Sequence, residues 1–432
     1  MILTLVLFIV TCALLILSIL LFPKIQIKNF RINTFWIICL ISALLMIIFQ
    51  CVSFTTIKDT LLSDNAINPI KILILFFSMT FLSIYLDELN FFSYLASKAS
   101  KLAKNNQISL FLILYAFVSL LTIFTSNDIV ILTFTPFICF FAKNAKIDPI
   151  PYLIGEFAAA NTWSMMLIIG NPTNIYLASS LGIDFIGYIK VMFLPTLLSG
   201  LFELFLIFIL FRKRLQKSIS YEAKETKIDN IPNFIIGISH LSICLVLLVI
   251  SSYLNIPMWL VALCSSISLV LAITISNIIQ HINFSNIIKT TKRLPYNLIP
   301  FVLSMFVIVS ALNEQGISSY LASILGNELI IYKYGFSSFI FSNIMNNIPM
   351  SVLFSTLPQM SQLENLKAIY ASIIGSNIGA FLTPLGALAG IMFTNLLSKY
   401  NVKYSFIDFI KYGTIISIPT LIIALSTLLI TI

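Results

Sequence analysis

The chain has 432 residues, of which 59% are hydrophobic and only 9% are charged, and its formal net charge is +9. A soluble globular protein carries roughly 25% charged residues, so this composition excludes a soluble domain and predicts an all-α polytopic membrane protein. The positive charge does not indicate a nucleic-acid partner, because the basic residues lie in short loops between apolar segments, as in the cytoplasmic loops of membrane proteins.

No motif indicates an enzyme or a cofactor. The sequence contains no nucleotide-binding loop, zinc motif or nucleophile elbow. The six cysteines are scattered through apolar segments without metal-binding or redox spacing, and we expect them to pack as small apolar residues. We therefore expect no catalytic residue, no metal and no cofactor, with energy supplied by an ion gradient or by a separate partner.

Residues 1–211 form the first of two predicted halves. The opening segment has no basic residue before it and is long enough to span, so we expect a retained helix rather than a cleaved signal peptide. Two later segments are interrupted, one by Ser126-Asn127-Asp128 and one by a Gly/Pro break at 170–174. The apolar segments of this half are expected at 2–22, 33–53, 70–90, 107–142, 151–180 and 185–211.

A polar stretch at 212–232 is expected to be a cytoplasmic linker, and the second half, residues 233–432, repeats the series. Asn346-Asn347 interrupts one segment, and the stretch 377–386 breaks a later one. Asn-rich interruptions and Gly/Pro breaks thus occur in the same order in both halves, which indicates an internal repeat around a binding site. The segments are expected at 233–252, 257–278, 295–313, 328–357, 367–397 and 405–432.

Lysines around the first interrupted segment predict a re-entrant hairpin. Three lysines precede the segment 107–142 and two follow it, which puts both of its ends on the cytoplasmic side. Its apolar arms of roughly 15 residues are also short for full spans. The segment 328–357 has few charges at either end, as a hairpin facing outward should. The five lysines are Lys98, Lys101, Lys104, Lys143 and Lys146.

The basic residues also predict the topology. All but five of the 25 Lys and Arg residues fall in or beside loops that this arrangement puts in the cytoplasm. Each half then has five transmembrane helices, one of them broken, plus one re-entrant hairpin. Because five is odd, the second half is inverted relative to the first. We expect an inner-membrane protein with both termini outside the cytoplasm. The five exceptions are Lys58, Lys71, Lys190, Lys333 and Lys367.

The hairpin tips and broken spans are expected to meet near the membrane midplane and to form the substrate site. Half-helix N-termini carry unpaired N–H groups, which suit an anion or a neutral hydroxyl ligand. Amides and irregular backbone are tolerated at this depth where they line a cavity or pack against protein. The candidate substrate-binding residues are Ser126, Asn127, Asn161, Thr162, Gly170, Asn171, Thr173, Asn174, Asn343, Asn346, Asn347, Ser376, Asn377, Thr383 and Gly386.

Two acidic residues are candidates for ion coupling. Asp128 lies at the first tip, where a carboxylate is costly in a membrane and suits a proton or sodium carrier; the alternative is an acid that caps a half-helix. Glu203 lies within a span. Glu156 is expected near the cytoplasmic end of its span, reaching toward water. Asp87 and Glu88 are expected at the cytoplasmic membrane surface.

Five stretches of the sequence carry a family pattern: Tyr85-Leu86-Asp87-Glu88 with Phe91-Phe92, then Asn127-Asp128, Ala160-Asn161-Thr162, the stretch 342–349, and Thr383-Pro384-Leu385-Gly386 with Leu396-Leu397-Ser398. They resemble the ion transporter superfamily and, within it, the arsenite/antimonite efflux permeases, which are the membrane subunits of arsenical pumps. The resemblance covers most of the chain. It implies ten spans plus two re-entrant hairpins, two inverted repeats, an elevator-type movement, and efflux of trivalent metalloid hydroxide against proton entry, sometimes with a soluble ATPase.

Three positions depart from that family's pattern. Asn161 and Asn377 stand where the pattern carries an acid, and Phe381 where it carries a lysine. Ser126-Asn127 and the stretch 170–174 are similar instead to the sister divalent-anion:sodium symporters, which import dicarboxylates or citrate. Sodium- or proton-coupled carboxylate transport therefore remains the alternative, and a passive anion channel is the alternative of another class.

The expected partners are the lipid bilayer, a small anion or metalloid substrate, and a coupling proton or sodium ion. A homodimer and a soluble ATPase partner remain open, and no nucleic acid is expected.

Overall fold

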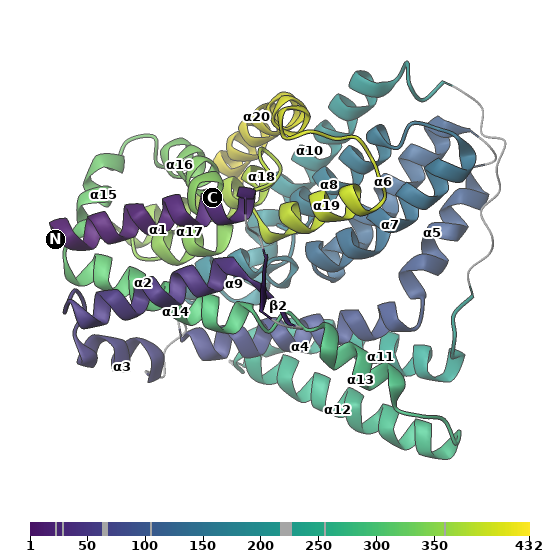
Figure 1. Ribbon diagram of the computed structural model, residues 1–432, viewed down its shortest axis with the longest axis horizontal. Helices are drawn as coiled ribbons and strands as arrows, with labels where there is room; N and C mark the ends of the chain where they lie inside the picture. The colour runs from purple at the N-terminus through teal and green to yellow at the C-terminus, as the bar shows by residue number, and fades with distance from the viewer. Residues whose placement is uncertain are drawn as a thin grey trace.

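A computed structural model of the chain describes residues 1–21, 24–27, 30–62, 68–103, 106–216, 227–254, 256–357 and 360–432, and these are almost entirely helical (Figure 1). Two short antiparallel strands, β1 (Lys24–Ile27) and β2 (Phe30–Asn33), follow the first helix and were not expected from the sequence. The middle of the predicted linker, 217–226, lies outside the described residues, as do Lys28 and Lys104.

The helices of the first half follow the predicted apolar segments, with two short helices, α3 and α5, that hydropathy did not predict. The elements are α1 (Ile2–Leu21), α2 (Thr34–Ile48), α3 (Phe54–Leu62), α4 (Pro69–Glu88), α5 (Phe91–Leu102), α6 (Gln107–Phe124), α7 (Asn127–Ala145), α8 (Ile150–Trp163), the 3-10 turn η1 (Ile168–Gly170), α9 (Pro172–Ser180) and α10 (Phe185–Phe211).

The second half builds the same order of elements, again with two short helices, α13 and α15, that were not predicted. The elements are α11 (Ile231–Leu254), α12 (Met258–Ile279), α13 (Ser285–Arg293), α14 (Leu298–Glu314), α15 (Ile317–Leu325), α16 (Ile330–Met345), α17 (Asn347–Phe354), α18 (Gln362–Gly379), α19 (Leu388–Lys399) and α20 (Phe406–Thr431).

Side-chain caps define where several of these helices begin. Asn68 accepts hydrogen bonds from the backbone N–H groups of Ile70 and Lys71, and Pro69 starts α4 without a donor of its own. Asn106 caps α6 and Asp184 caps α10 in the same manner. In these three helices, a polar residue before the apolar run therefore supplies a partner for free N–H groups of the first turn.

Corresponding helices of the two halves make corresponding contacts. The helix α2 packs against α14, and α12 packs against α4, so each half contributes a helix to the other. The second hairpin arms behave alike, since α7 contacts α19 and α17 contacts α9. In Figure 1, α5 to α8 lie at one end of the molecule and α14 to α17 at the other, with α10, α18 and α20 between them. Such matching contacts are expected of an internal repeat. The inversion of the second half relative to the first stays a prediction.

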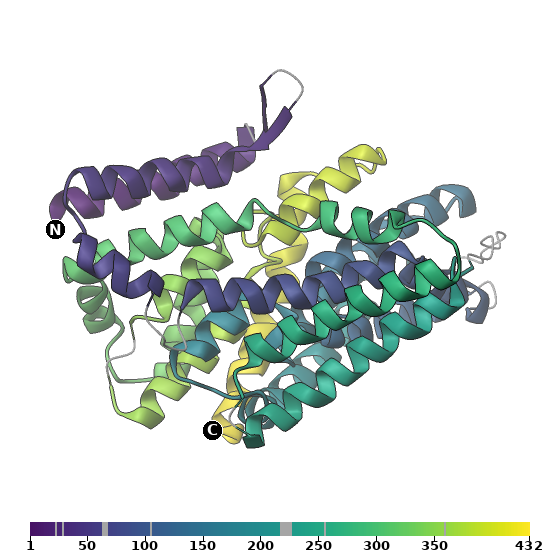
Figure 2. The ribbon, with the colours of Figure 1, turned by 90° about the horizontal axis from the view of Figure 1, so that it is seen from below.

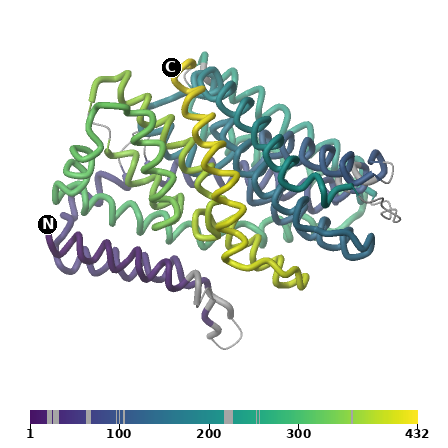
Figure 3. Tube along the Cα trace, turned by 90° about the horizontal axis from the view of Figure 1, so that it is seen from above, coloured from purple at the N-terminus to yellow at the C-terminus, as the bar shows by residue number. Residues whose placement is uncertain are grey.

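Two further views show how the layers lie. In Figure 2, α1 and α2 form a layer along one edge, with the two strands at its end. Figure 3 shows α20 running through the centre of the molecule, where it packs against α10 and α18. Within the described ranges, eight helices are long and apolar enough to cross a membrane by length and composition, so the chain is a multi-pass membrane protein.

The arms of the first hairpin are longer than the sequence suggested. The helix α6 has 18 residues and α7 has 19, against the roughly 15 residues expected, so the expectation of short arms was wrong. Helices of this length are nearly as long as a membrane span, which needs about 20 residues. Length therefore no longer distinguishes a re-entrant hairpin from two spans, and the hairpin prediction rests on the flanking lysines.

Candidate functional site

The first predicted tip contacts the first broken span directly. The turn between α6 and α7 places Asn127 at the start of α7, and its Nδ2 donates to Oδ1 of Asn161 in the last turn of α8, at 3.2 Å. Asn127 Oδ1 also accepts the backbone N–H of Asp128 at 2.9 Å. The structure thus joins two of the predicted binding residues from different elements, and both are buried.

The break in the first span is built from the residues that predicted it. The helix α8 ends at Trp163, and α9 begins at Pro172, whose preceding residue Asn171 caps it by accepting the N–H of Thr173 at 3.2 Å. Asn174 Nδ2 donates to the carbonyl oxygens of Ser164 at 2.9 Å and Leu167 at 3.1 Å. These bonds satisfy carbonyl groups that the broken helix leaves free inside the protein.

The second tip contacts the second break in the same way. Asn343 Oδ1 accepts the backbone N–H of Thr383 at 3.1 Å and its hydroxyl at 2.7 Å. Asn346 Nδ2 donates to the Leu385 carbonyl at 3.1 Å, and the Asn347 N–H donates to the Gly386 carbonyl at 3.1 Å. Asn346 has a φ of 75°, a conformation that non-glycine residues rarely adopt and that often marks functional sites.

Small residues bring the second hairpin unusually close to the second broken span. A Cβ atom at Gly375 on α18 would overlap Ser338 Oγ and the Gly335 carbonyl oxygen on α16. A Cβ atom at Gly379, one turn further on, would lie 2.5 Å from Ser342 Oγ. Glycine four residues apart allows two membrane helices to approach at backbone distance. The second tip therefore cannot separate from its broken span without losing this contact.

Asn377 links the two halves of the chain. Its Oδ1 accepts hydrogen bonds from Ser164 Oγ at 3.0 Å and from Asn171 Nδ2 at 2.9 Å. Its Nδ2 donates to Asn174 Oδ1 at 2.7 Å and to the Ile373 carbonyl at 2.8 Å. One buried amide in α18 thus holds three side chains from the break between α8 and α9.

Four predicted binding residues carry a buried side-chain oxygen without a hydrogen-bond partner in the described part of the chain: Ser126 Oγ, Thr173 Oγ1, Asn347 Oδ1 and Ser376 Oγ. Ser126 lies at the first tip and Asn347 at the second. Thr173 follows the first break, and Ser376 precedes the second. Among the described residues twelve buried side-chain atoms lack a partner, and these four belong to the predicted site. An unpartnered buried polar group costs about 1–3 kcal/mol, so each of the four oxygens can take a further hydrogen bond.

The acidic residues lie in different surroundings. Asp128 is half-buried at the first tip, and its carboxylate has no hydrogen-bond partner among the described residues. Glu203 on α10 is fully buried; it accepts hydrogen bonds from the Thr162 hydroxyl and, at 3.1 Å, from Tyr115. The hydroxyl of Thr162, predicted to bind substrate, is therefore bonded to Glu203.

The expectation for Glu156 was wrong. Its side chain does not reach toward water, because the residue is only 2% exposed. Both carboxyl oxygens lie within hydrogen-bond distance of Thr135 Oγ1 on α7, at 2.9 and 3.0 Å. No pattern of residues indicated this contact, since Thr135 and Glu156 lie on different helices.

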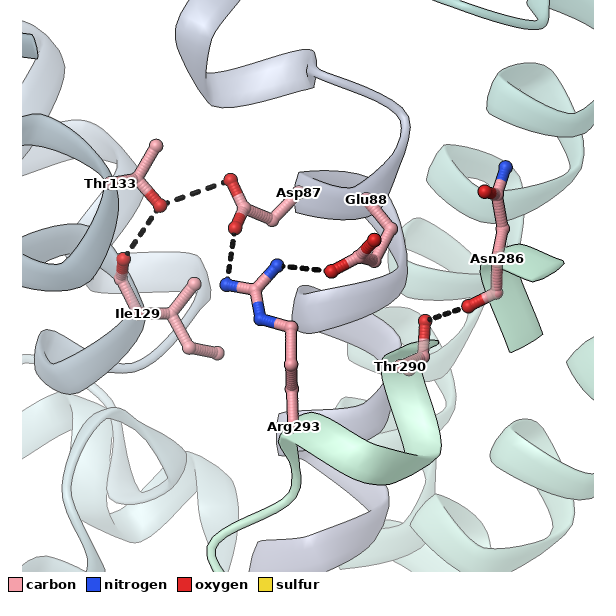
Figure 4. Close-up of polar contacts among 7 residues, drawn as sticks. All are labelled: Asp87, Glu88, Ile129, Thr133, Asn286, Thr290 and Arg293. Carbon is pink, nitrogen blue, oxygen red and sulfur yellow. Dashed lines mark hydrogen bonds and ion pairs between the residues drawn. The ribbon is translucent and has the colours of Figure 1, made fainter. Parts of the chain in front are cut away.

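The pair Asp87 and Glu88 ends α4 in a charge cluster outside the predicted substrate site (Figure 4). Arg293 at the end of α13 donates to Asp87 at 2.6 Å and to Glu88 at 2.5 Å. Thr133 on α7 donates to the second Asp87 oxygen at 3.0 Å. The cluster thus connects α4 and α13 to the first hairpin. Asp87 and Glu88 are only 10% and 11% exposed, and their place at the cytoplasmic membrane surface stays a prediction.

Sequence reasoning missed three residues of these networks. Ser164 bonds Asn377 from the first break, Tyr115 bonds Glu203, and Thr135 bonds Glu156. Only Ser164 had a usable signal, because it lies three residues after Asn161 in the interrupted span. No group of three or more His, Cys, Asp or Glu side chains that could hold a metal ion occurs within the described ranges.

Comparisons with known proteins agree on the class of protein. The sequence model of a family described as citrate transporter matches residues 30–375. The chain is 28% identical over 379 residues to a Bacillus subtilis (strain 168) protein provisionally named an arsenical pump membrane protein, covering 78% of this chain and 82% of that protein. It is 24% identical over 368 residues to the arsenical pump membrane protein of Escherichia coli, covering 82% and 84%.

A solved structure shares the fold. The Alcanivorax borkumensis YdaH transporter, whose crystal structure is described as revealing an unusual topology, superposes with a TM-score of 0.57 at 12% sequence identity. The match covers 98% of this chain and 97% of that one. At this identity the similarity concerns the fold alone, and it extends over the whole helical arrangement described above.

Proposed function

The chain belongs to the citrate transporter family, and from that premise we propose that it is a secondary active transporter whose substrate binds between the hairpin tips and the broken spans. The observation that carries this proposal is the set of four unpartnered oxygens on Ser126, Thr173, Asn347 and Ser376. A small ligand with several oxygens or hydroxyl groups would supply the missing partners.

The chemistry of these atoms favours a neutral metalloid hydroxide over a carboxylate. Asn347 Oδ1 is an acceptor only and needs a donor from the ligand. A metalloid hydroxide has several O–H groups that both donate and accept, whereas an ionised carboxylate group accepts only. None of the candidate binding residues is a lysine or arginine, so no basic side chain among them balances a multiply charged anion. The named arsenical pump relatives support the same substrate class.

We further propose proton-coupled efflux across the inner membrane, with the basic loops in the cytoplasm and both termini outside it. Asp128, half-buried and without a partner at the first tip, is the candidate coupling acid nearest the substrate, and Glu203 is the second. In this proposal the two hairpin tips and the two broken spans form one core, which moves across the membrane against the remaining helices in an elevator-type motion. A second copy of the chain and a soluble ATPase belong to this proposal as partners to be tested.

The second candidate function is sodium- or proton-coupled transport of a di- or tricarboxylate. The family description favours it, and so do the N-termini of α7, α9 and α17, which begin at Asn127, Pro172 and Asn347. Each such terminus carries roughly half a positive charge, which attracts an anion.

The test is flux into proteoliposomes that contain the purified protein, first with arsenite and then with succinate or citrate, under imposed proton and sodium gradients. Saturable, proton-driven arsenite movement supports the efflux proposal. Sodium-driven carboxylate uptake without arsenite movement would replace it with the second candidate. Flux that does not saturate and never exceeds the passive gradient would indicate a channel and overturn both.

A further inference from the structure

We propose that Glu156 is a second proton-binding site of the transport cycle, at the contact between α7 and α8 behind the substrate site. The inference rests on the proposed proton-coupled transport and adds a group to it that the sequence did not suggest. It follows from the burial of this carboxyl group, from the count of hydrogens around it, and from its place on the two helices that join tip and break.

The carboxyl group is buried without a counter-charge. Glu156 is 2% exposed, and no lysine, arginine or histidine is paired with it among the described residues. An isolated carboxylate in such surroundings is costly by several kcal/mol, and a group that can neutralise itself by taking up a proton does so. Glu156 therefore holds a proton in the conformation seen here.

The hydrogen count around Thr135 agrees. Both Glu156 oxygens lie within hydrogen-bond distance of the same Thr135 oxygen, at 2.9 and 3.0 Å. A hydroxyl group has one proton and can make one full hydrogen bond as donor. In the acid form the carboxyl group donates to the hydroxyl oxygen and accepts from it, so both contacts are full hydrogen bonds. An ionised carboxylate would have to share the single hydroxyl proton between its two oxygens.

The surrounding helices contribute few other titratable groups. The helix α8 packs against α6, α7, α10 and α18. On α7, Cys139 lies one turn beyond Thr135. Tyr115 on α6 and Glu203 on α10 meet α8 further along, at Trp163 and Thr162. From α18, the neutral amide of Asn377 contacts Ser164, just beyond the end of α8.

The location couples this proton to the substrate site. Glu156 lies five residues before Asn161 on α8, and Thr135 lies eight residues after Asn127 on α7, about 7.5 and 12 Å along the two helices at 1.5 Å per residue. The helices lie side by side in Figure 1. The same pair of helices thus carries the Asn127–Asn161 contact and the Thr135–Glu156 contact. Loss of the proton leaves a buried charge whose donors all come from Thr135, which favours separation of α7 from α8 and hence an altered tip.

The first measurement is proton release on metalloid binding, in weakly buffered detergent solution with a pH indicator. The second is metalloid counterflow in proteoliposomes without an imposed ion gradient. The test variant is Glu156→Gln, which keeps the shape and a hydrogen-bonding side chain but cannot ionise. Thr135→Val removes the hydroxyl at nearly constant volume. The matched control is Glu364→Gln, the same substitution at a partly exposed acid at the start of α18.

We expect Glu156→Gln to keep counterflow while it releases fewer protons per bound metalloid than wild type, and its gradient-driven uptake to fall at least tenfold. Thr135→Val should shift the pH at which release is half-complete, and Glu364→Gln should match wild type. Unchanged proton release and unchanged gradient-driven uptake in Glu156→Gln would overturn the inference while leaving the proposed transport intact. Absence of counterflow in wild type with every substrate would overturn the proposed function and this inference together.

Discussion

Replacement of Asn377 by leucine should destabilise the protein more than any other single change in the amide network. The substitution removes the acceptor for Ser164 and Asn171 and the donor to Asn174. Side-chain hydrogen bonds between membrane helices contribute about 0.6–1.7 kcal/mol each, so the three bonds amount to about 2–5 kcal/mol. Ser164 keeps a second acceptor in the Asn161 carbonyl at 2.7 Å, and we therefore expect a loss in the lower half of that range.

The assay is equilibrium unfolding in mixed detergent micelles, with increasing sodium dodecyl sulfate and circular dichroism as the readout. The matched control is Asn144→Leu, because Asn144 is exposed near the end of α7 and bonds only a carbonyl of its own helix, at 2.8 Å. Equal unfolding free energies for Asn377→Leu and Asn144→Leu would refute the view that Asn377 joins the two halves. An acid variant, Asn377→Asp, keeps the acceptor but must carry a proton to replace the donor, so its stability should fall as the pH rises.

Three further outcomes follow from the tips and the close helix contact. Asp128→Asn should abolish gradient-coupled transport while the protein still inserts, and full coupled flux in that variant would remove Asp128 from the mechanism. Asn127→Leu and Asn346→Leu should each raise the apparent Kd for substrate about 5- to 150-fold, because each loses about 1–3 kcal/mol of polar contact at a tip; titration with unchanged affinity in both would contradict the tip site. Gly375→Val should lower the thermal unfolding midpoint, since its Cβ would overlap Ser338 and Gly335, and thermal stability equal to wild type would show that the helices can move apart.

The sequence predicted the parts of the fold whose signal is local. Long apolar runs gave the positions of the main helices, and the Asn, Gly and Pro residues at 170–174 and 377–386 gave the two breaks. The short helices escaped prediction for a physical reason. The helix α13, for example, has only two apolar residues, Ile287 and Ile288, among its nine positions, and so has no apolar run to detect.

Contacts across long separations could not be predicted from the residues alone. Asn377 was a candidate because it lies in a broken span, but its partners lie 203 to 213 positions away. The prediction that Glu156 reaches toward water was wrong, because it relied on the position of Glu156 near the end of its span. In the folded chain Glu156 is buried and bonded to Thr135 on the preceding helix. The types of residue in the site were therefore predictable, while the choice of partner depended on how the helices pack.

The direction of the pH dependence of binding separates the two substrate classes that the family relationships leave open. If a neutral metalloid hydroxide binds beside an acid that must ionise to accept its O–H groups, binding releases a proton, and linkage requires affinity to rise with pH. An anion brought toward the same acids is repelled by about 1.7 kcal/mol per pair of like unit charges at about 10 Å and an effective dielectric constant of about 20. Its binding would therefore take up protons, and its affinity would fall as the pH rises.

Measuring the affinity for arsenite and for citrate against pH in the same preparation gives the direction of the pH dependence for each substrate. Arsenite affinity that is independent of pH would exclude both Asp128 and Glu156 as coupling groups, whatever substrate the protein moves.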